Sequence, residues 1–231
     1  MKVLQHGNRG YKVEYLQGLL NRSMTRDRTG GTPLRVDGIF GPRTEAALQA
    51  FQRRQRPPVT DRGAGMPTWS AFGVRIEKEH TNVRLFGQPT GTSCWSAAAT
   101  MIFGNQSVGP GQAHLGAGGG LRGTMDEHQA FARSMGWQML NHSPSVSELA
   151  GIVQRTPVWI RGGGSGWAHA VVLSGVFSDG DDRGDGTMFR VHDPWPPNVG
   201  KIYGSFASPL TMFDSSGVNR VPASLDFVLV P

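Results

Sequence analysis

The order of hydrophobic and polar positions divides the chain into two parts of different character. In the first part, apolar residues recur at intervals of three or four in three short stretches, which is typical of amphipathic helices. The first stretch follows Gly10 and gives way to a polar loop at Arg22, the second begins at Pro42, and the third covers residues 67–72. Proline suits the first turn of a helix. The pattern therefore predicts a small bundle of three helices.

The second part begins with helical patterns and ends with strand patterns. A run of small and apolar residues from 94 to 103 predicts a buried helix, and capping boxes at Thr124 and Ser145 predict two more. Runs rich in β-branched residues then predict strands at 158–160, 170–177, 188–192 and 225–230. Helices followed by strands favour the α+β class with an antiparallel sheet.

The pattern changes between Gly73 and Gly87, so we assign residues 1–75 to a first domain and residues 76–231 to a second. The chain has 38% hydrophobic and 17% charged residues, which is ordinary for a globular protein. This composition indicates neither disorder nor a membrane span.

Charge separates the two parts as clearly as hydrophobicity does. Residues 1–75 hold thirteen Lys or Arg and five Asp or Glu, a net charge of +8, whereas residues 76–231 hold ten and twelve, a net charge of −2. A basic surface attracts anionic polymers, which include nucleic acid and peptidoglycan with its stem-peptide carboxylates. No recognised nucleic-acid motif accompanies the arginines, so we expect no nucleic-acid partner. A merely solvated basic face is the alternative.

Cys94 is the single cysteine of the chain, so its thiol cannot form an intramolecular disulfide. It opens the predicted buried helix and precedes Trp95. A thiol attacks well only as thiolate, and a helix N-terminus or a neighbouring imidazole can lower its pKa from the free value of about 8.5. We interpret Cys94 as a nucleophile, and a small buried hydrophobe is the alternative.

His169 and Asp193 are the expected partners of this thiol. His169 begins a β-branched run typical of a central strand, and Asp193 ends the next strand-like run just before Pro194. Adjacent strands could bring the carboxylate against the imidazole, where it would fix the tautomer of a general base. Gln88 precedes the thiol by six positions, and its amide could stabilise an oxyanion together with the Cys94 backbone N–H. The alternatives are a core histidine and a turn aspartate.

Residues 88–194 resemble the papain-like cysteine peptidases, especially the compact bacterial effector and processing peptidases. The resemblance rests on the order of four motifs: Gln88, Cys94 followed by Trp95, His169 before an apolar strand, and Asp193 in Asp-Pro. It implies a papain-like fold in which Cys94, His169, Asp193 and Gln88 are catalytic. The chain departs from the larger papains in its shorter length and in having aspartate where those enzymes have asparagine.

Residues 6–73 resemble the peptidoglycan-binding domain that bacterial wall hydrolases carry as an accessory module. The markers include Asp37-Gly38 and Phe40-Gly41 ahead of the second helix, Phe51-Gln52 at its end, and Thr68-Trp69. The resemblance implies that peptidoglycan is a partner. The alternatives are a stabilising cap or a module that holds another ligand. We expect Asp37 and Gly38 to form a turn rather than to contact sugar.

Together the two resemblances imply a cysteine hydrolase that cuts an amide bond in peptidoglycan stem peptides or cross-links. No set of residues resembles the zinc ligands of wall amidases, so we expect no metal and no cofactor. A papain-like protease that acts on proteins, with the module as a wall anchor, is the alternative within enzymes. A binding protein with an inert thiol is the alternative outside them.

Three other features have less direct functional interpretations. His192 lies on the opposite strand face from Asp193 and is expected to be structural rather than to line the site. The acidic segment 178–186 lacks the terminal glutamate of an EF-hand loop, so a solvated hairpin turn is favoured over calcium binding. The glycine-rich segment 116–120 predicts a flexible loop at the border of the cleft.

Export must be explained, because the cell wall lies outside the cytoplasm. Residues 1–7 contain no apolar stretch of the ~7 to 15 residues that a signal peptide needs. Either this chain has lost its signal, or the protein leaves by a dedicated secretion system and acts in the periplasm of a target bacterium. In the second case, a carrier in the secretion machine and an immunity protein would be further partners.

Overall fold

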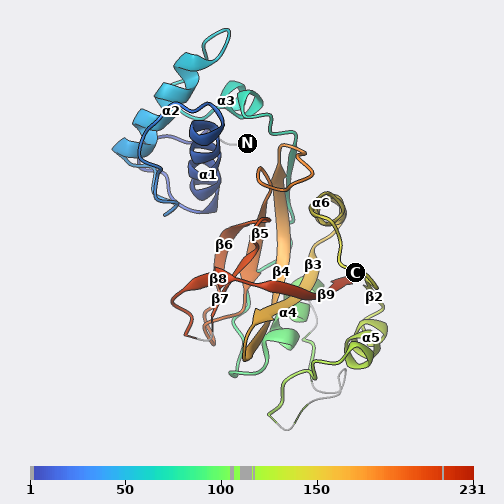
Figure 1. Cartoon of the computed structure of the whole chain (residues 1–231). Helices are drawn as coiled ribbons and strands as arrows, with labels where there is room; N and C mark the ends of the chain where they lie inside the picture. Colours follow the sequence, from blue (N-terminus) through green and yellow to red (C-terminus); the bar gives the residue numbers. More distant parts are fainter. Residues whose placement is uncertain (1–2, 105–106, 110–115, 117, 215) are drawn as a thin grey trace.

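The computed structural model describes residues 3–104, 107–109, 116, 118–214 and 216–231. Figure 1 shows a helical module at one end of the molecule and a sheet with flanking helices at the other. This arrangement confirms the predicted α+β class. No helix in the described ranges has both the length and the apolar character to cross a membrane.

The module consists of α1 (Tyr11–Arg26), α2 (Pro42–Arg54) and α3 (Met66–Ala71), which confirms the predicted three-helix bundle. Its core is built from the apolar faces of these helices, and Phe51 of α2 stacks on Phe72 with ring centroids 3.9 Å apart. Gln17 is buried, and its side-chain oxygen accepts hydrogen bonds from the backbone N–H groups of Asp37 and Gly38. These bonds fix the turn ahead of α2.

The second domain contains α4 (Cys94–Phe103), α5 (Met125–Ser134) and α6 (Val146–Arg155). The predicted caps are present, since Thr124 accepts a hydrogen bond from the Glu127 N–H and Ser145 accepts one from the Glu148 N–H. Each cap satisfies an N–H group that would otherwise lack a partner at the start of the helix.

The seven-stranded sheet is antiparallel, with the order β2-β9-β3-β4-β5-β6 and with β1 paired to β4. A separate hairpin is formed by β7 and β8. The strands are β1 (Ile76–Glu79), β2 (Gln138–Met139), β3 (Val158–Gly164), β4 (Trp167–Ser178), β5 (Met188–Asp193), β6 (Lys201–Phe206), β7 (Thr211–Phe213), β8 (Arg220–Pro222) and β9 (Ser224–Val230).

The sheet separates two apolar cores because alternate residues of β4 point to opposite faces. Ala170 and Val172 pack with Trp95 of α4, whereas Val171 and Leu173 pack with the apolar face of α6. Helix α4 thus lies against the middle of the sheet, and Cys94 at its first residue is held over the central strand.

The module is docked on the second domain through α1. Phe177 and Met188, at the far ends of β4 and β5, belong to the same buried cluster as the α1 core. The buried Tyr15 donates its hydroxyl hydrogen to the Gly186 carbonyl over 2.8 Å, and Arg22 forms ion pairs with Asp179 and Asp181. The acidic segment is therefore a hairpin turn, as predicted, but it also binds the module rather than only solvent.

Candidate active site

The thiol occupies the first turn of a buried helix. A turn at Thr90–Ser93 leads into α4, with the Thr90 N–H donating to the Ser93 hydroxyl over 2.9 Å. Cys94 is the first residue of α4, and the backbone N–H groups of Trp95 and Ala170 donate toward its sulfur. The sulfur thus has hydrogen-bond donors suited to a thiolate.

His169 lies on β4, which begins at Trp167, three residues before the predicted strand 170–177. Its Nε2 is 2.6 Å from Oδ1 of Asp193, and both residues are buried, His169 being 8% exposed and Asp193 0%. Because Nε2 of His169 is hydrogen-bonded to Asp193, Nδ1 is the ring nitrogen that remains for the hydrogen bond with the Cys94 thiol. The structure therefore brings Cys94, His169 and Asp193 into one chain of hydrogen bonds.

The three groups shift one another's ionisation. Burial raises the pKa of Cys94, but the hydrogen bond and charge of His169, with the two backbone N–H groups, lower it below its ordinary value. Burial lowers the pKa of His169, but Asp193 and Cys94 together raise it to about 10. Opposite shifts of this kind favour a thiolate beside an imidazolium.

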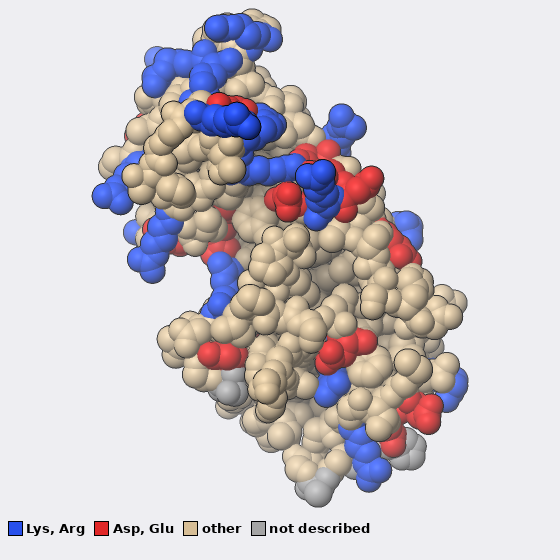
Figure 2. All heavy atoms as spheres, in the orientation of Figure 1, with Lys and Arg blue, Asp and Glu red and all other residues tan. Residues whose placement is uncertain are grey.

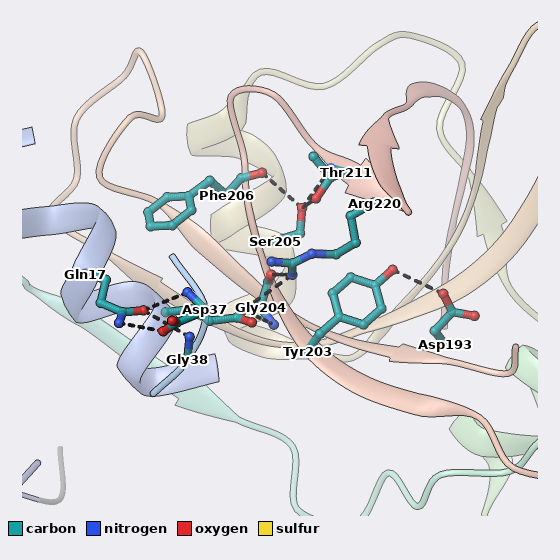
Figure 3. Close-up of polar contacts among 11 residues, drawn as sticks. Gln17, Asp37, Gly38, Asp193, Tyr203, Gly204, Ser205, Phe206, Thr211 and Arg220 are labelled. Atoms are coloured by element: carbon teal, nitrogen blue, oxygen red, sulfur yellow. Dashed lines mark hydrogen bonds and ion pairs between the residues drawn. The ribbon is translucent and has the colours of Figure 1, made fainter. Parts of the chain in front are cut away.

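Asp193 has two further donors that hold its carboxylate. The Trp195 backbone N–H donates to Oδ1 over 2.8 Å. The Tyr203 hydroxyl donates to Oδ2 over 3.2 Å, as Figure 3 shows. Burial and the charge of Asp193 raise the pKa of Tyr203 well above its ordinary value, so its hydroxyl keeps its proton. Tyr203 is not among the residues that the sequence predicts for the site. It lies ten residues after Asp193, in a stretch whose apolar pattern is too weak to predict a strand.

Gln88 is buried beside the Asp193 segment. Its backbone N–H donates to the Pro194 carbonyl and its carbonyl accepts from the Asn198 N–H, both over 2.9 Å. Its side-chain amide donates to the Thr90 carbonyl over 2.6 Å, within the turn that precedes Cys94. One amide hydrogen is left for another acceptor, so the oxyanion role of Gln88 stays a prediction.

Two cavities adjoin the thiol and the imidazole. The first, of about 250 Å³, is lined by residues that include Cys94, Trp95, Arg161 and His169. The second, of about 110 Å³, has His169 in its wall together with Trp167 and Trp195 but does not include Cys94. The two cavities share Gly91, Ala168 and His169. Together they make a cleft along the thiol and the imidazole.

His192 and the glycine-rich segment 116–120 differ in their relation to this cleft. His192 is buried and its Nδ1 lies 2.6 Å from the Ser174 hydroxyl, so it packs inside the sheet rather than in the cleft. In the glycine-rich segment, the Gly118 carbonyl accepts from the Thr92 hydroxyl and Gly120 lines the first cavity. Ala117 of this segment lies outside the described residues. The described part of the segment borders the cleft.

In the part of the chain that the structure describes, no group of three or more His, Cys, Asp or Glu side chains is arranged to bind a metal ion.

A cysteine at a helix start, facing a histidine and an aspartate on an antiparallel sheet, defines the papain-like cysteine proteases. The family model of the papain-like cysteine protease AvrRpt2 matches residues 77–208, more than half of the chain, and the chain belongs to this family. A peptidoglycan-binding domain model matches residues 9–66. Neither the curated proteins nor the solved structures gave a match. Both predicted resemblances are confirmed.

Proposed function

We propose that this cysteine protease is a peptidoglycan hydrolase, which cuts an amide bond in stem peptides or cross-links. The observation that carries the proposal is the docking of a peptidoglycan-binding domain on the protease domain through a buried interface. Residues of both domains share one apolar cluster, and ion pairs that include those of Arg22 with Asp179 and Asp181 join the domains. Polymer bound by the module is thus held close to the protease domain, which raises its local concentration at the cleft.

The surface of the module supports an anionic polymer as its ligand. Lys and Arg side chains gather over the helical end of the molecule in Figure 2, and residues 1–75 carry a net charge of +8. A groove of about 910 Å³ on this module is lined by apolar residues together with Arg35, Arg43 and Asp37. Such a groove suits a polymer that presents both sugar rings and carboxylates.

The proposed reaction uses the thiolate directly. Cys94 attacks the carbonyl carbon of the scissile amide, and the Cys94 backbone N–H and the Gln88 amide stabilise the oxyanion. The His169 imidazolium then donates its proton to the leaving amine, which yields an acyl-enzyme. A water molecule, deprotonated by His169, hydrolyses this thioester. Asp193 holds the ring in one orientation during both proton transfers.

The proposed setting is the periplasm or cell wall of a target bacterium, reached by secretion. In that setting the protein is an antibacterial effector, a producing cell needs an immunity protein, and a secretion machine needs a carrier. Expression of the protein in the periplasm of a susceptible bacterium tests this. Lysis by wild type and not by Cys94→Ala is expected, whereas equal toxicity of both forms would exclude a catalytic effect.

Mass spectrometry of purified sacculi after digestion tests the reaction itself. We expect wild type to release new soluble muropeptides with one amide bond cut, and Cys94→Ala to bind the sacculi without releasing any. The match to a protease family favours one other candidate, a protease that acts on proteins with the module as anchor. Unchanged muropeptides beside a cleaved protein substrate would support that candidate.

A further inference from the structure

The cavity beside the thiol contains an arginine that the reaction described above does not use. Arg161 lies on β3 opposite Ala170 of β4, the residue after His169. Both Arg161 and Ala170 line the cavity of about 250 Å³ that holds Cys94. Of the residues that line this cavity in the described part of the chain, none has a carboxylate. A cation thus lines the same cavity as the thiol, and the described residues of that cavity wall include no acidic one.

The guanidinium of Arg161 is held in place by its neighbours, but its positive charge is only weakly compensated by its ion pair with Asp226. It lies over the ring of Phe227, 5.8 Å from the centroid. It also packs against Gly123, where an added Cβ would lie only 3.1 Å from Nη2 of the arginine. Its ion pair with Asp226 is long, at 3.7 Å, and the Asp226 side chain is 37% exposed. A pair of this length that is open to solvent on the Asp226 side is weak. Arginine carries five N–H donors, so donors are left for a second carboxylate.

The proposed cleavage reaction indicates which part of the substrate lies beside Arg161. The acyl part becomes bonded to Cys94, whereas the leaving amine takes its proton from His169. His169 lines both cavities, but only the cavity with Arg161 also contains the Cys94 thiol. The acyl part of the substrate therefore lies in the cavity with Arg161.

We propose that Arg161 binds a free carboxylate on the acyl part of the substrate and so selects anionic peptides. This inference rests on the proposed function in one respect, because the carboxylates of peptidoglycan stem peptides supply such a group. A bidentate guanidinium–carboxylate pair also orients the acyl chain, since its two parallel hydrogen bonds restrict rotation. Arg161 is thus a specificity-determining residue rather than a catalytic one.

Two alkylating probes test the inference without any assumption about the natural substrate. Both are iodoacetyl amino acid amides that label Cys94, one made from glutamate with a free side-chain carboxylate and one from glutamine. We expect wild type to react at least about tenfold faster with the glutamate probe, the discrimination typical of a charge-assisted hydrogen bond. Arg161→Gln should lose this preference, Arg161→Lys should keep part of it, and Arg133→Gln, on the exposed face of α5, should keep all of it.

The rate of labelling by the glutamine probe is the control for folding, because this probe reacts with the thiol but has no side-chain carboxylate that Arg161 could bind. Equal preference in wild type and Arg161→Gln would overturn the inference. Should Arg161→Gln fail to fold, an absence of any preference in wild type would overturn it instead. If sacculi are not cut and the preference persists, the proposed substrate is wrong and the carboxylate site stands.

Discussion

Tyr203 and Asp193 are joined by a hydrogen bond from the phenolic hydroxyl to Oδ2, 3.2 Å long, inside the core. The other oxygen of the same carboxylate accepts from His169 and from the Trp195 backbone N–H. Asp193 has no exposed surface, so these donors replace the water that would otherwise stabilise its charge. The orienting carboxylate of the site is thus itself oriented by β6.

Replacing Tyr203 by phenylalanine should lower kcat several-fold and leave KM nearly unchanged. The variant keeps the ring but removes one donor to Asp193, which weakens the hold on the His169 ring and costs about 0.5–1.5 kcal/mol of stability. Steady-state kinetics and thermal unfolding measure the two effects. Tyr15→Phe is the matched control, because it removes a hydroxyl bonded to Gly186 in the domain interface. It should lose similar stability without a change in kcat, and equal kcat losses in both variants would contradict the prediction.

The pH dependence of kcat/KM should be bell-shaped around the thiolate–imidazolium pair. The rising limb follows deprotonation of Cys94, whose pKa is lowered by His169 and the backbone donors against the effect of burial. The falling limb follows loss of the His169 proton, whose pKa is raised to about 10 chiefly by Asp193. Activity is therefore lost in acid as the thiolate gains a proton and in alkali as the imidazolium loses one.

Asp193→Asn should move the alkaline limb to lower pH, because removing the carboxylate leaves burial to lower the pKa of His169. The rate at the optimum should also fall, by roughly 10²-fold or more. Alkylation of Cys94 by iodoacetamide across the same pH range measures the ion pair independently of substrate. An alkaline limb at the same pH in wild type and variant would show that Asp193 does not stabilise the imidazolium.

The sequence predicts the parts of the fold that depend on local patterns. Capping residues at Thr124 and Ser145 and β-branched runs determine the helix starts and the central strands, so these elements match. The short strands β1 and β2 and the hairpin of β7 and β8 were not predicted. They have two to four residues each, which is too short for alternation to stand out from loops. The strand β6 was missed because Gly204 and Ser205 interrupt its apolar pattern.

The relations between distant segments could not be predicted in this way. Asp179 and Asp181 follow the pattern of a solvated turn, and only the docking of α1 makes them partners of Arg22. In the same way, Arg161 follows the pattern of any strand arginine until the pairing of β3 with β4 brings it to the thiol. The residue order that links Cys94, His169 and Asp193 indicated their grouping, because each occupies the end or start of a predicted element.

Replacing Gln88 by alanine should lower kcat by roughly 10²-fold, the cost typical of one lost oxyanion donor. The rate of Cys94 alkylation by iodoacetamide should stay close to wild type, since that reaction develops no oxyanion. Comparing the two rates separates a role in the transition state from a role in holding the Thr90–Ser93 turn. If both rates fall together, Gln88 supports the loop through its bond to the Thr90 carbonyl and not the oxyanion.

The interface between module and protease domain depends on a glycine in the middle of α1. A Cβ built on Gly18 would overlap Cζ of Phe206 on β6, so any side chain there would force the Phe206 ring or the helix to move. The close approach allows Tyr15 and Phe206 to pack with ring centroids 6.1 Å apart. Wild type should therefore unfold in one cooperative transition, because neither domain can unfold or separate without exposing the apolar cluster that both domains share.

Gly18→Leu should separate this transition into two or lower its midpoint, since overpacking typically costs about 1–3 kcal/mol. Differential scanning calorimetry measures the change. Thr25→Leu places the same side chain on the exposed part of α1 and should leave a single transition. Leucine favours a helix more than glycine by about 1 kcal/mol, so any stabilisation of the isolated helix would oppose the expected loss. A Gly18→Leu protein that unfolds like Thr25→Leu would show that the two domains are not held together through this contact.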